Sequence, residues 1–193
     1  MKLSGAALPV FFAGVLLSST AAAEGTTALI LKTGQFTLSE DSQVVLFDRL
    51  EFDDKSSGVF GAELEWRMPD GLSLGGELTF YRNDWASAFF LFDSGQVDTT
   101  ILMFNVKKYF TASKVIHPYI GAGAGVAVTD FSGTITGNSS GLALQAIGGI
   151  EFRWDKVGLY TEFKALSADT EDDLDHQVDV SGTGIFAGLS IYF

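Results

Sequence analysis

Residues suited to acid–base catalysis are scarce in this 193-residue chain, which contains two histidines and no cysteine. The best-spaced pair is His176 and Ser181, which stand five positions apart in an acidic stretch. A histidine base beside a serine hydroxyl is the pairing that activates a nucleophile. The other histidine, His117, falls at a predicted turn. A solvated loop side chain is the simpler interpretation of His176, so we predict no catalytic site and no enzyme.

The stretch around His176 also has the residue types of a hard-metal site. Its acids are Asp169, Glu171, Asp172, Asp173, Asp175 and Asp179. Carboxylate oxygens are the ligands of Ca²⁺ and Mg²⁺. However, Leu174 occupies the position that glycine holds in an EF-hand loop, and acidic runs are usually solvated. We therefore predict neither a metal site nor a cofactor.

A glycine repeat, Gly121-Ala-Gly123-Ala-Gly125, is similar in part to a phosphate-binding loop. The third glycine of the G-x-G-x-x-G motif would fall at position 126, where the chain has valine. Glycines that face a crowded interior explain the repeat more simply. The formal charge of −12 also argues against nucleic acid, whose phosphates need cationic partners.

The elements that would position these residues are β-strands. Between Phe60 and Arg82, apolar side chains alternate with polar residues or glycine over two arms. A period of two indicates strands rather than a helix. The arms are joined by Met68-Pro69-Asp70-Gly71, which has the residues of a tight turn. We therefore predict a β-hairpin.

The same alternation recurs along the chain and predicts eight strands. They cover residues 27–38, 60–68, 72–82, 99–110, 118–130, 141–154, 157–166 and 182–193. Long loops (39–58, 83–98, 131–140 and 167–181) alternate with short turns. The two faces of the first strand are too similar to assign its inward face. An even number of strands joined in this way predicts an all-β, eight-stranded antiparallel up-and-down barrel.

The N-terminus has the features of a secretory leader. Lys2 precedes the apolar segment Leu8 to Leu17, and the small residues Ala21-Ala22-Ala23 follow. We expect residues 1–23 to be a cleaved signal peptide and residues 24–193 to form the barrel domain. Because the leader contains Lys2 and no acidic residue, its removal changes the formal net charge from −12 to −13. Mean hydropathy is +0.25, yet no run of roughly 20 apolar residues follows the leader. This combination predicts a transmembrane barrel with apolar residues facing lipid.

The alternation assigns charged residues to the lumen and aromatic residues to one rim. The predicted lumen charges are Glu63, Glu65, Glu77, Glu151 and Glu162 against Arg67, Lys107, Arg153 and Lys164. Ion pairs among them would fill the interior of an eight-stranded barrel. The last outward aromatic residues of alternate strands are Trp66, Phe110, Trp154 and Phe193. They predict an interfacial aromatic girdle at the periplasmic end, where the short turns lie.

Two segments carry a resemblance to a known family. Pro118-Tyr-Ile-Gly-Ala-Gly-Ala-Gly125 and the C-terminal Leu189-Ser-Ile-Tyr-Phe193 resemble the eight-stranded outer-membrane barrels of Gram-negative bacteria, the OmpA-, OmpX- and OmpW-like group that includes porin-family and opacity-like proteins. The resemblance implies an integral outer-membrane protein with both termini in the periplasm. It implies contact with lipid and lipopolysaccharide, and recognition of the C-terminal strand by the barrel-assembly machinery. We expect a monomer without a nucleic-acid partner.

Three functions are compatible with this architecture. In the first, the lumen is largely filled and polar, and acidic extracellular loops have a structural or surface-interaction role. In the second, the resemblance to OmpW-like barrels implies a narrow channel for small hydrophobic compounds. Its apolar mouth would consist of Trp85, Phe89, Phe90 and Phe92 above inward-facing Ile101 and Met103. The third, disfavoured function is a lipid A-modifying enzyme, for which the chain lacks the His-x-Ser-Asn pattern of lipid A deacylases.

Overall fold

The computed structural model describes residues 25–39, 44–45, 49–52, 56–87, 94–111, 113–133, 137–171 and 177–193. Its long strands are β1 (Thr26–Leu38), β4 (Ser56–Arg67), β5 (Leu72–Ser87), β6 (Ser94–Tyr109), β7 (Ile116–Gly133), β8 (Gly137–Trp154), β9 (Val157–Glu171) and β11 (Gly182–Tyr192). Its short strands are β2 (Val44–Val45), β3 (Arg49–Phe52) and β10 (Gln177–Asp179). The predicted leader, residues 1–23, lies outside the described residues. None of the described residues belongs to a helix long and apolar enough to cross a membrane.

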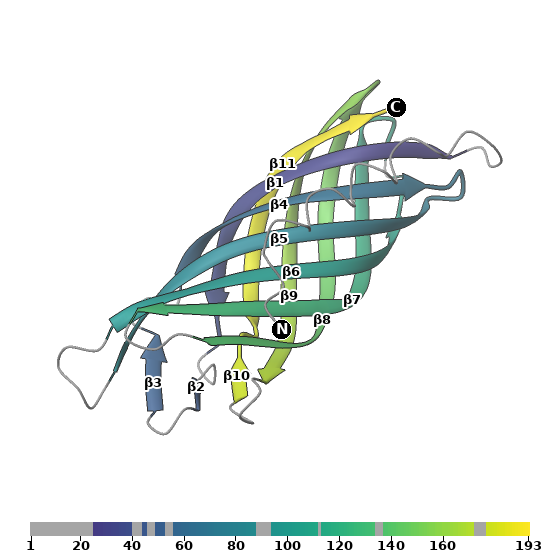
Figure 1. Cartoon of the computed structure of the whole chain (residues 1–193). Coiled ribbons are helices and arrows are strands. Elements are labelled where there is room, and N and C mark those ends of the chain that lie inside the picture. Colours follow the sequence, from purple (N-terminus) through teal and green to yellow (C-terminus); the bar gives the residue numbers. More distant parts are fainter. Residues whose placement is uncertain are drawn as a thin grey trace.

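The eight long strands form one closed antiparallel barrel (Figure 1). Strands that follow one another along the chain are paired, and β1 pairs with both β4 and β11. The seam between β1 and β11 contains eleven residue pairs, from Ala28–Tyr192 to Leu38–Gly182. Each long strand therefore has two neighbours, as hydrocarbon requires because it offers no partner to a free strand edge. The predicted eight-stranded up-and-down barrel is confirmed.

The short connections lie together at one end of the barrel, the short-turn end. Between β4 and β5, Gly71 has a φ of +83°, a conformation that glycine adopts without steric cost. Its N–H donates to the carbonyl of Met68 at 3.0 Å and closes the predicted turn. Between β8 and β9, Asp155 has a φ of 48° in a two-residue turn. The start of β7 was predicted at Pro118, but the strand begins two residues earlier, at Ile116.

At the opposite end, the long-loop end, strands continue into the segments that we predicted to be loops. β5 and β6 stay paired as far as Ala86 and Ser94, and β7 and β8 as far as Phe131 and Gly137. The predicted extent of these loops was therefore wrong. Alternation marks a strand only where its two faces meet different surroundings. Beyond the lipid both faces can be polar, so the pattern fades while backbone pairing continues.

The three short strands occupy the long-loop end where three long strands stop. There, β1 ends at Leu38, β4 begins at Ser56 and β11 begins at Gly182. β10 pairs with β9 and β2, β2 pairs with β3, and β3 pairs with β5. These pairings bridge β9 to β5, so the long-loop end carries a second closed ring of paired backbone (Figure 1).

The outer face of the barrel is apolar, and the charged residues of the same strands point inward. Large side chains exposed on the outer face include Phe60, Phe104, Leu144 and Ile185. Glu63 of β4 and Lys107 of β6, in contrast, are at most 2% exposed. This arrangement is the reverse of a water-soluble protein and fits a barrel surrounded by hydrocarbon.

Candidate functional site in the barrel lumen

The middle of the lumen contains a group of buried charged side chains, here named the ion-pair network. Its members are Lys32, Glu63, Glu65, Arg67, Glu77, Lys107, Glu151, Glu162 and Lys164. They come from β1, β4, β5, β6, β8 and β9. Residues two positions apart on a strand share a face, so Glu63, Glu65 and Arg67 all point inward from β4. The network therefore connects six of the eight long strands.

Glu63 is the centre of one part of the network. Its Oε2 accepts hydrogen bonds from Lys32 Nζ at 2.9 Å and from Lys107 Nζ at 2.7 Å. Its Oε1 accepts a hydrogen bond from the side-chain amide of Asn105 at 3.1 Å. A buried carboxylate is tolerated when its oxygens have donors and its charge has a partner, and Glu63 has both.

Glu77, the direct partner of Glu63 in the pairing of β4 with β5, is the centre of a second part. It forms an ion pair with Lys164 and accepts a hydrogen bond from Asn105 at 2.8 Å. Lys164 also lies 3.4 Å from Glu162, which accepts a hydrogen bond from the Tyr119 hydroxyl at 2.9 Å. Asn105 donates to both Glu63 and Glu77, so it joins the two parts.

Arg67 ends the network on the side of the short turns. Its guanidinium donates to Glu65 at 2.8 Å and 3.0 Å and to Glu151 at 2.8 Å. The same group lies 3.5 Å from the ring centre of Tyr109, at the distance of a cation–π contact. Glu151 accepts a further hydrogen bond from the Ser190 hydroxyl at 2.6 Å, so β11 is attached to the network as well.

Lys32 is the member that the sequence prediction missed, because the inward face of its strand was left open. Its Nζ lies 2.9 Å from Glu63, 3.2 Å from Glu77 and 3.3 Å from Glu162. Four predicted bases against five acids left one carboxylate without a counter-charge. This missing positive charge could have predicted that Lys32 points into the lumen, since Lys32 is the only charged residue in the segment 27–38.

The half of the lumen nearer the long loops carries an apolar cluster beside uncharged polar side chains such as Thr99 and Thr129, so the predicted charged lining does not extend there. One cluster contains Phe36, Leu38, Val59, Tyr81, Val97, Ile101, Met103, Ala127, Ala143, Leu166, Ala168, Val180 and Phe186. Where this apolar cluster meets Lys164 and Gln145, a cavity of about 20 Å³ remains. A space of that size holds about one water molecule. At this level the described lumen is therefore filled by side chains.

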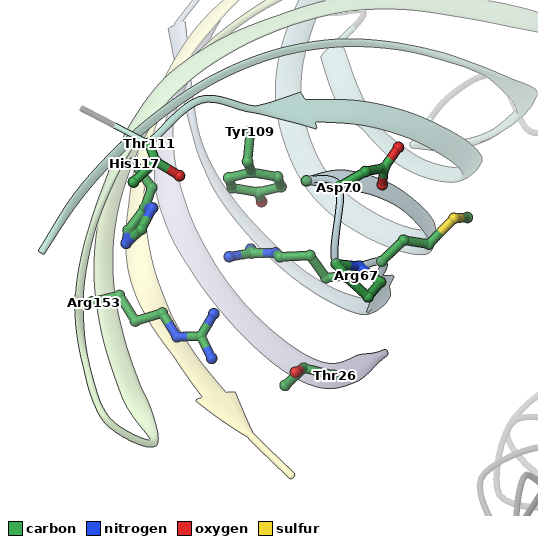
Figure 2. A pocket seen from close by; sticks show the side chains of 10 residues that line it. Thr26, Arg67, Asp70, Tyr109, Thr111, His117 and Arg153 are labelled. Atoms are coloured by element: carbon green, nitrogen blue, oxygen red, sulfur yellow. The ribbon is translucent and has the colours of Figure 1, made fainter. Parts of the chain in front are cut away.

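At the short-turn end the lumen opens into a cavity of about 340 Å³, here named the mouth pocket. Its lining consists of Thr26, Arg67, Met68, Pro69, Asp70, Gly71, Tyr109, Thr111, His117 and Arg153. Figure 2 shows Arg67 and Arg153 extending into the pocket from facing walls, with His117 beside Arg153. The wall is thus predominantly polar and carries two guanidinium groups.

Arg153 belongs to the mouth pocket and not to the ion-pair network, contrary to the prediction. Its guanidinium lies 3.9 Å from the ring centre of Tyr192. No carboxylate of the described residues forms an ion pair with it. The reason is its position: Arg153 stands one residue from the end of β8, beyond the layer of Glu151.

The four predicted girdle residues lie on the outer face, where β4, β6, β8 and β11 reach the short-turn end. The exposed fractions are 37% for Trp66, 48% for Phe110, 52% for Trp154 and 75% for Phe193. Trp66 is paired with Thr27, whose carbonyl accepts a hydrogen bond from the N–H of Phe193 at 2.9 Å. Their role at a membrane interface stays a prediction.

Several candidates lie outside the described residues, namely Phe89, Phe90, Phe92, Asp172, Asp173, Asp175 and His176. Of the predicted apolar mouth, Trp85 lies in β5 opposite Gly95, while Ile101 and Met103 belong to the apolar cluster. The Ser181 hydroxyl accepts a hydrogen bond from the N–H of Ala168 at 3.1 Å. Within the described ranges, no three His, Asp or Glu side chains form a group that could hold a metal ion.

Solved structures with the same fold are outer-membrane proteins. Neisserial surface protein A matches with a TM-score of 0.64 at 13% identity, over 87% of this chain and 97% of that one. OprG from Pseudomonas aeruginosa matches with a TM-score of 0.60 at 13% identity, over 88% and 96%. Ail, the attachment invasion locus protein of Yersinia pestis, matches with a TM-score of 0.50 at 14% identity, over 88% and 98%.

No family model and no curated protein sequence matches the chain. The similarity to solved structures is one of backbone arrangement, and it covers nearly the whole length of each. The closed eight-stranded barrel is therefore the fold that this chain shares with these outer-membrane proteins.

Proposed function

We propose that this chain is an integral protein of the bacterial outer membrane whose barrel anchors an acidic surface at the long-loop end. The apolar outer face supports a membrane location, and the predicted leader supports export. Barrels of this class keep short turns in the periplasm. In that orientation both termini are periplasmic and the long-loop end faces the outside.

The distribution of charge carries the proposal. The connections and strand ends at the long-loop end contain sixteen acidic residues, which are Glu40, Asp41, Asp48, Glu51, Asp53, Asp54, Asp84, Asp93, Asp98, Asp130, Asp169, Glu171, Asp172, Asp173, Asp175 and Asp179. The basic residues there are three, Arg49, Lys55 and Arg82. In the lumen, in contrast, five acids face five bases once Lys32 and Arg153 are included. The negative excess therefore belongs to the proposed outer surface, where it favours a positively charged partner.

Membrane lipid and the assembly machinery are the other proposed partners. The outer face would contact lipid, and the acidic end would lie near the divalent ions of lipopolysaccharide. The strand that ends at Phe193 would be read by the barrel-assembly machinery during insertion. We propose a monomer, because the barrel closes through its own first and last long strands and needs no second copy to do so.

A channel for small hydrophobic compounds is the second candidate, and the apolar cluster is the observation in its favour. The ion-pair network lies below that cluster, and the cavity between them has room for about one water molecule. Passage would require Lys164 and its partners to separate. Because the ion pairs obstruct the lumen, we rank the channel function second to the surface role.

Two measurements separate the candidates. We expect the purified protein to give no stable conductance in a planar bilayer and no uptake of small hydrophobic compounds into liposomes. We also expect cells that display it to bind a lysine-rich peptide, and the triple variant Asp169→Asn, Glu171→Gln, Asp179→Asn to bind it more weakly. Asp70→Asn and Asp155→Asn, at the short-turn end, are the matched controls and should bind like the parent.

The proposal fails if the triple variant and the controls bind the peptide equally. Conductance or uptake by the parent protein would instead favour the channel. A gel in which the unboiled and boiled protein migrate differently shows that each variant still forms a barrel. Protease treatment of intact cells should cleave at the long-loop end and leave the short turns intact.

A further inference from the structure

The mouth pocket has the size and wall of a small-molecule site. Its volume of about 340 Å³ lies within the range of ligand pockets, about 300–1,000 Å³. Its walls come from β1, β4, β6, β7, β8 and the turn between β4 and β5. Because these strands belong to a closed barrel, paired backbone holds the walls of the pocket in place.

Arg153 is the residue of this pocket whose side-chain N–H groups are available as hydrogen-bond donors. The central carbon of its guanidinium lies over the Tyr192 ring, 3.9 Å from the ring centre. This cation–π contact holds the group in place, and no side chain of the described residues accepts a hydrogen bond from its N–H groups. No described carboxylate pairs with it. The edge of a fixed guanidinium matches the two oxygens of a carboxylate or phosphate.

The other polar groups of the wall suit the same kind of ligand. His117 enters from β7 beside Arg153, and its imidazole can donate a hydrogen bond (Figure 2). Thr26 and Thr111 add two hydroxyl groups, which can also donate. Arg67 is not counted among the ligand contacts, because its guanidinium already donates hydrogen bonds to Glu65 and Glu151.

The acidic groups near the pocket have partners of their own. Asp70 Oδ1 accepts a hydrogen bond from the N–H of Leu72 at 3.0 Å, and its Oδ2 lies 3.8 Å from Lys108 Nζ. Glu151, which lies deeper, accepts from Arg67 and from the Ser190 hydroxyl. Repulsion of an incoming anion by these carboxylates is thereby reduced.

From this arrangement we infer that the mouth pocket binds an oxyanion, with Arg153 as its main contact and His117, Thr26 and Thr111 as further donors. The ligand is a carboxylate or phosphate group on a small solute that enters from the short-turn end. This site is separate from the acidic long-loop surface and does not depend on its role.

The experiment is a titration of the isotope-labelled full chain in detergent micelles, followed by nuclear magnetic resonance. Sodium phosphate and sodium acetate are the two probes, each added at constant ionic strength against chloride. We expect at least one probe to shift the Arg153 side-chain signal and the His117 signals with a saturable curve. Arg153→Gln should bind that probe at least about tenfold more weakly, since a hydrogen bond to a charged group is lost.

Arg82→Gln is the matched control, because it removes a guanidinium at the opposite end of the barrel. It should leave the titration unchanged. Arg153→Lys keeps the charge but lacks the two parallel N–H donors of the guanidinium, and His117→Phe removes the donor beside Arg153. Both variants should bind less tightly than the parent, and they test the site even if Arg153→Gln does not fold. Saturation by phosphate alone or acetate alone identifies the ligand group.

The inference is overturned if neither anion gives a saturable shift. It is equally overturned if folded Arg153→Gln, or both other pocket variants, bind like the parent. A shift of the same size in Arg82→Gln and in Arg153→Gln would show ionic screening only, which also rejects the site.

Discussion

Lys32 Nζ on β1 donates a hydrogen bond of 2.9 Å to Glu63 Oε2 on the neighbouring strand β4. The same ammonium group lies 3.2 Å from Glu77 on β5 and 3.3 Å from Glu162 on β9. One side chain thus forms ion pairs with carboxylates from three other strands. Lys32 lies in β1, which forms the seam of the barrel with β11. Its ion pairs therefore connect the seam to the centre of the ion-pair network.

Replacing Lys32 with methionine should destabilise the barrel strongly. Three buried carboxylates would share the remaining lysines, and removal of one member of a buried ion pair costs about 3–5 kcal/mol. Arg82→Met is the control, because the Arg82–Asp98 pair is exposed to solvent and such pairs contribute little to stability. Urea unfolding in phospholipid vesicles, followed by tryptophan fluorescence, measures both. Equal losses would contradict a structural role of the network.

A charge on the lipid-facing surface should be costly only in the middle of the barrel. Phe104 is 58% exposed on β6, six residues before the predicted girdle residue Phe110. We expect Phe104→Arg to lower the free energy of unfolding by about 2–4 kcal/mol in vesicles, and Thr183→Arg, at the long-loop end of β11, by about 0–1 kcal/mol. If the two variants unfold alike, the proposed position of the membrane is wrong.

Glycines that face inward and outward should differ in their tolerance of a methyl group. A Cβ at Gly121 would lie 2.7 Å from the carbonyl oxygen of Val106 and 2.8 Å from Lys107 Cγ. A Cβ at Gly148 would meet no atom within 4 Å. Overpacking costs about 1–3 kcal/mol, so Gly121→Ala should destabilise by that amount. Gly148→Ala should change stability by about 0.5 kcal/mol or less, as measured by the same urea unfolding.

The turn between β4 and β5 should require glycine at position 71. Its φ of +83° is unfavourable for other residues, and a Cβ there would lie 2.7 Å from the carbonyl oxygen of Tyr109. Gly71→Ala should therefore cost about 1–3 kcal/mol. Asp155→Gly is the reverse substitution at a φ of 48°, and we expect it to be tolerated. The midpoints of thermal unfolding in detergent compare the two, and equal loss in both would reject this explanation.

The fold was predictable where the lumen is charged and the outside is apolar. In the hairpin from Phe60 to Arg82, glutamates alternate with large apolar residues, and the observed β4 and β5 follow that pattern. The contrast between ion-paired interior and hydrocarbon exterior fixes the register, since a slip by one residue would expose every charge to lipid. The charged members of this segment were assigned to the correct face for that reason.

The first strand was not predictable in the same way. Its inward residues are Ala28, Ile30, Lys32, Phe36 and Leu38, which are mostly apolar. The outward face of β1 includes Leu31, which is 48% exposed, and is apolar in part as well. Where the lumen is lined by the apolar cluster, inside and outside have the same polarity, and alternation carries no information. The mouth pocket was missed for another reason: it joins six segments whose contact depends on closure of the barrel.

The seam between β1 and β11 has a consequence for biogenesis. Within the barrel, β11 completes the cylinder and is the last strand that the ribosome makes, while its partner β1 is the first. Until residues Gly182 to Tyr192 have been made, the strands of the growing chain cannot close into a barrel. Two strand edges would then lack hydrogen-bond partners, and lipid cannot supply them. Closure of the barrel in the membrane therefore requires β11, and a product that ends before it could not form the same closed barrel.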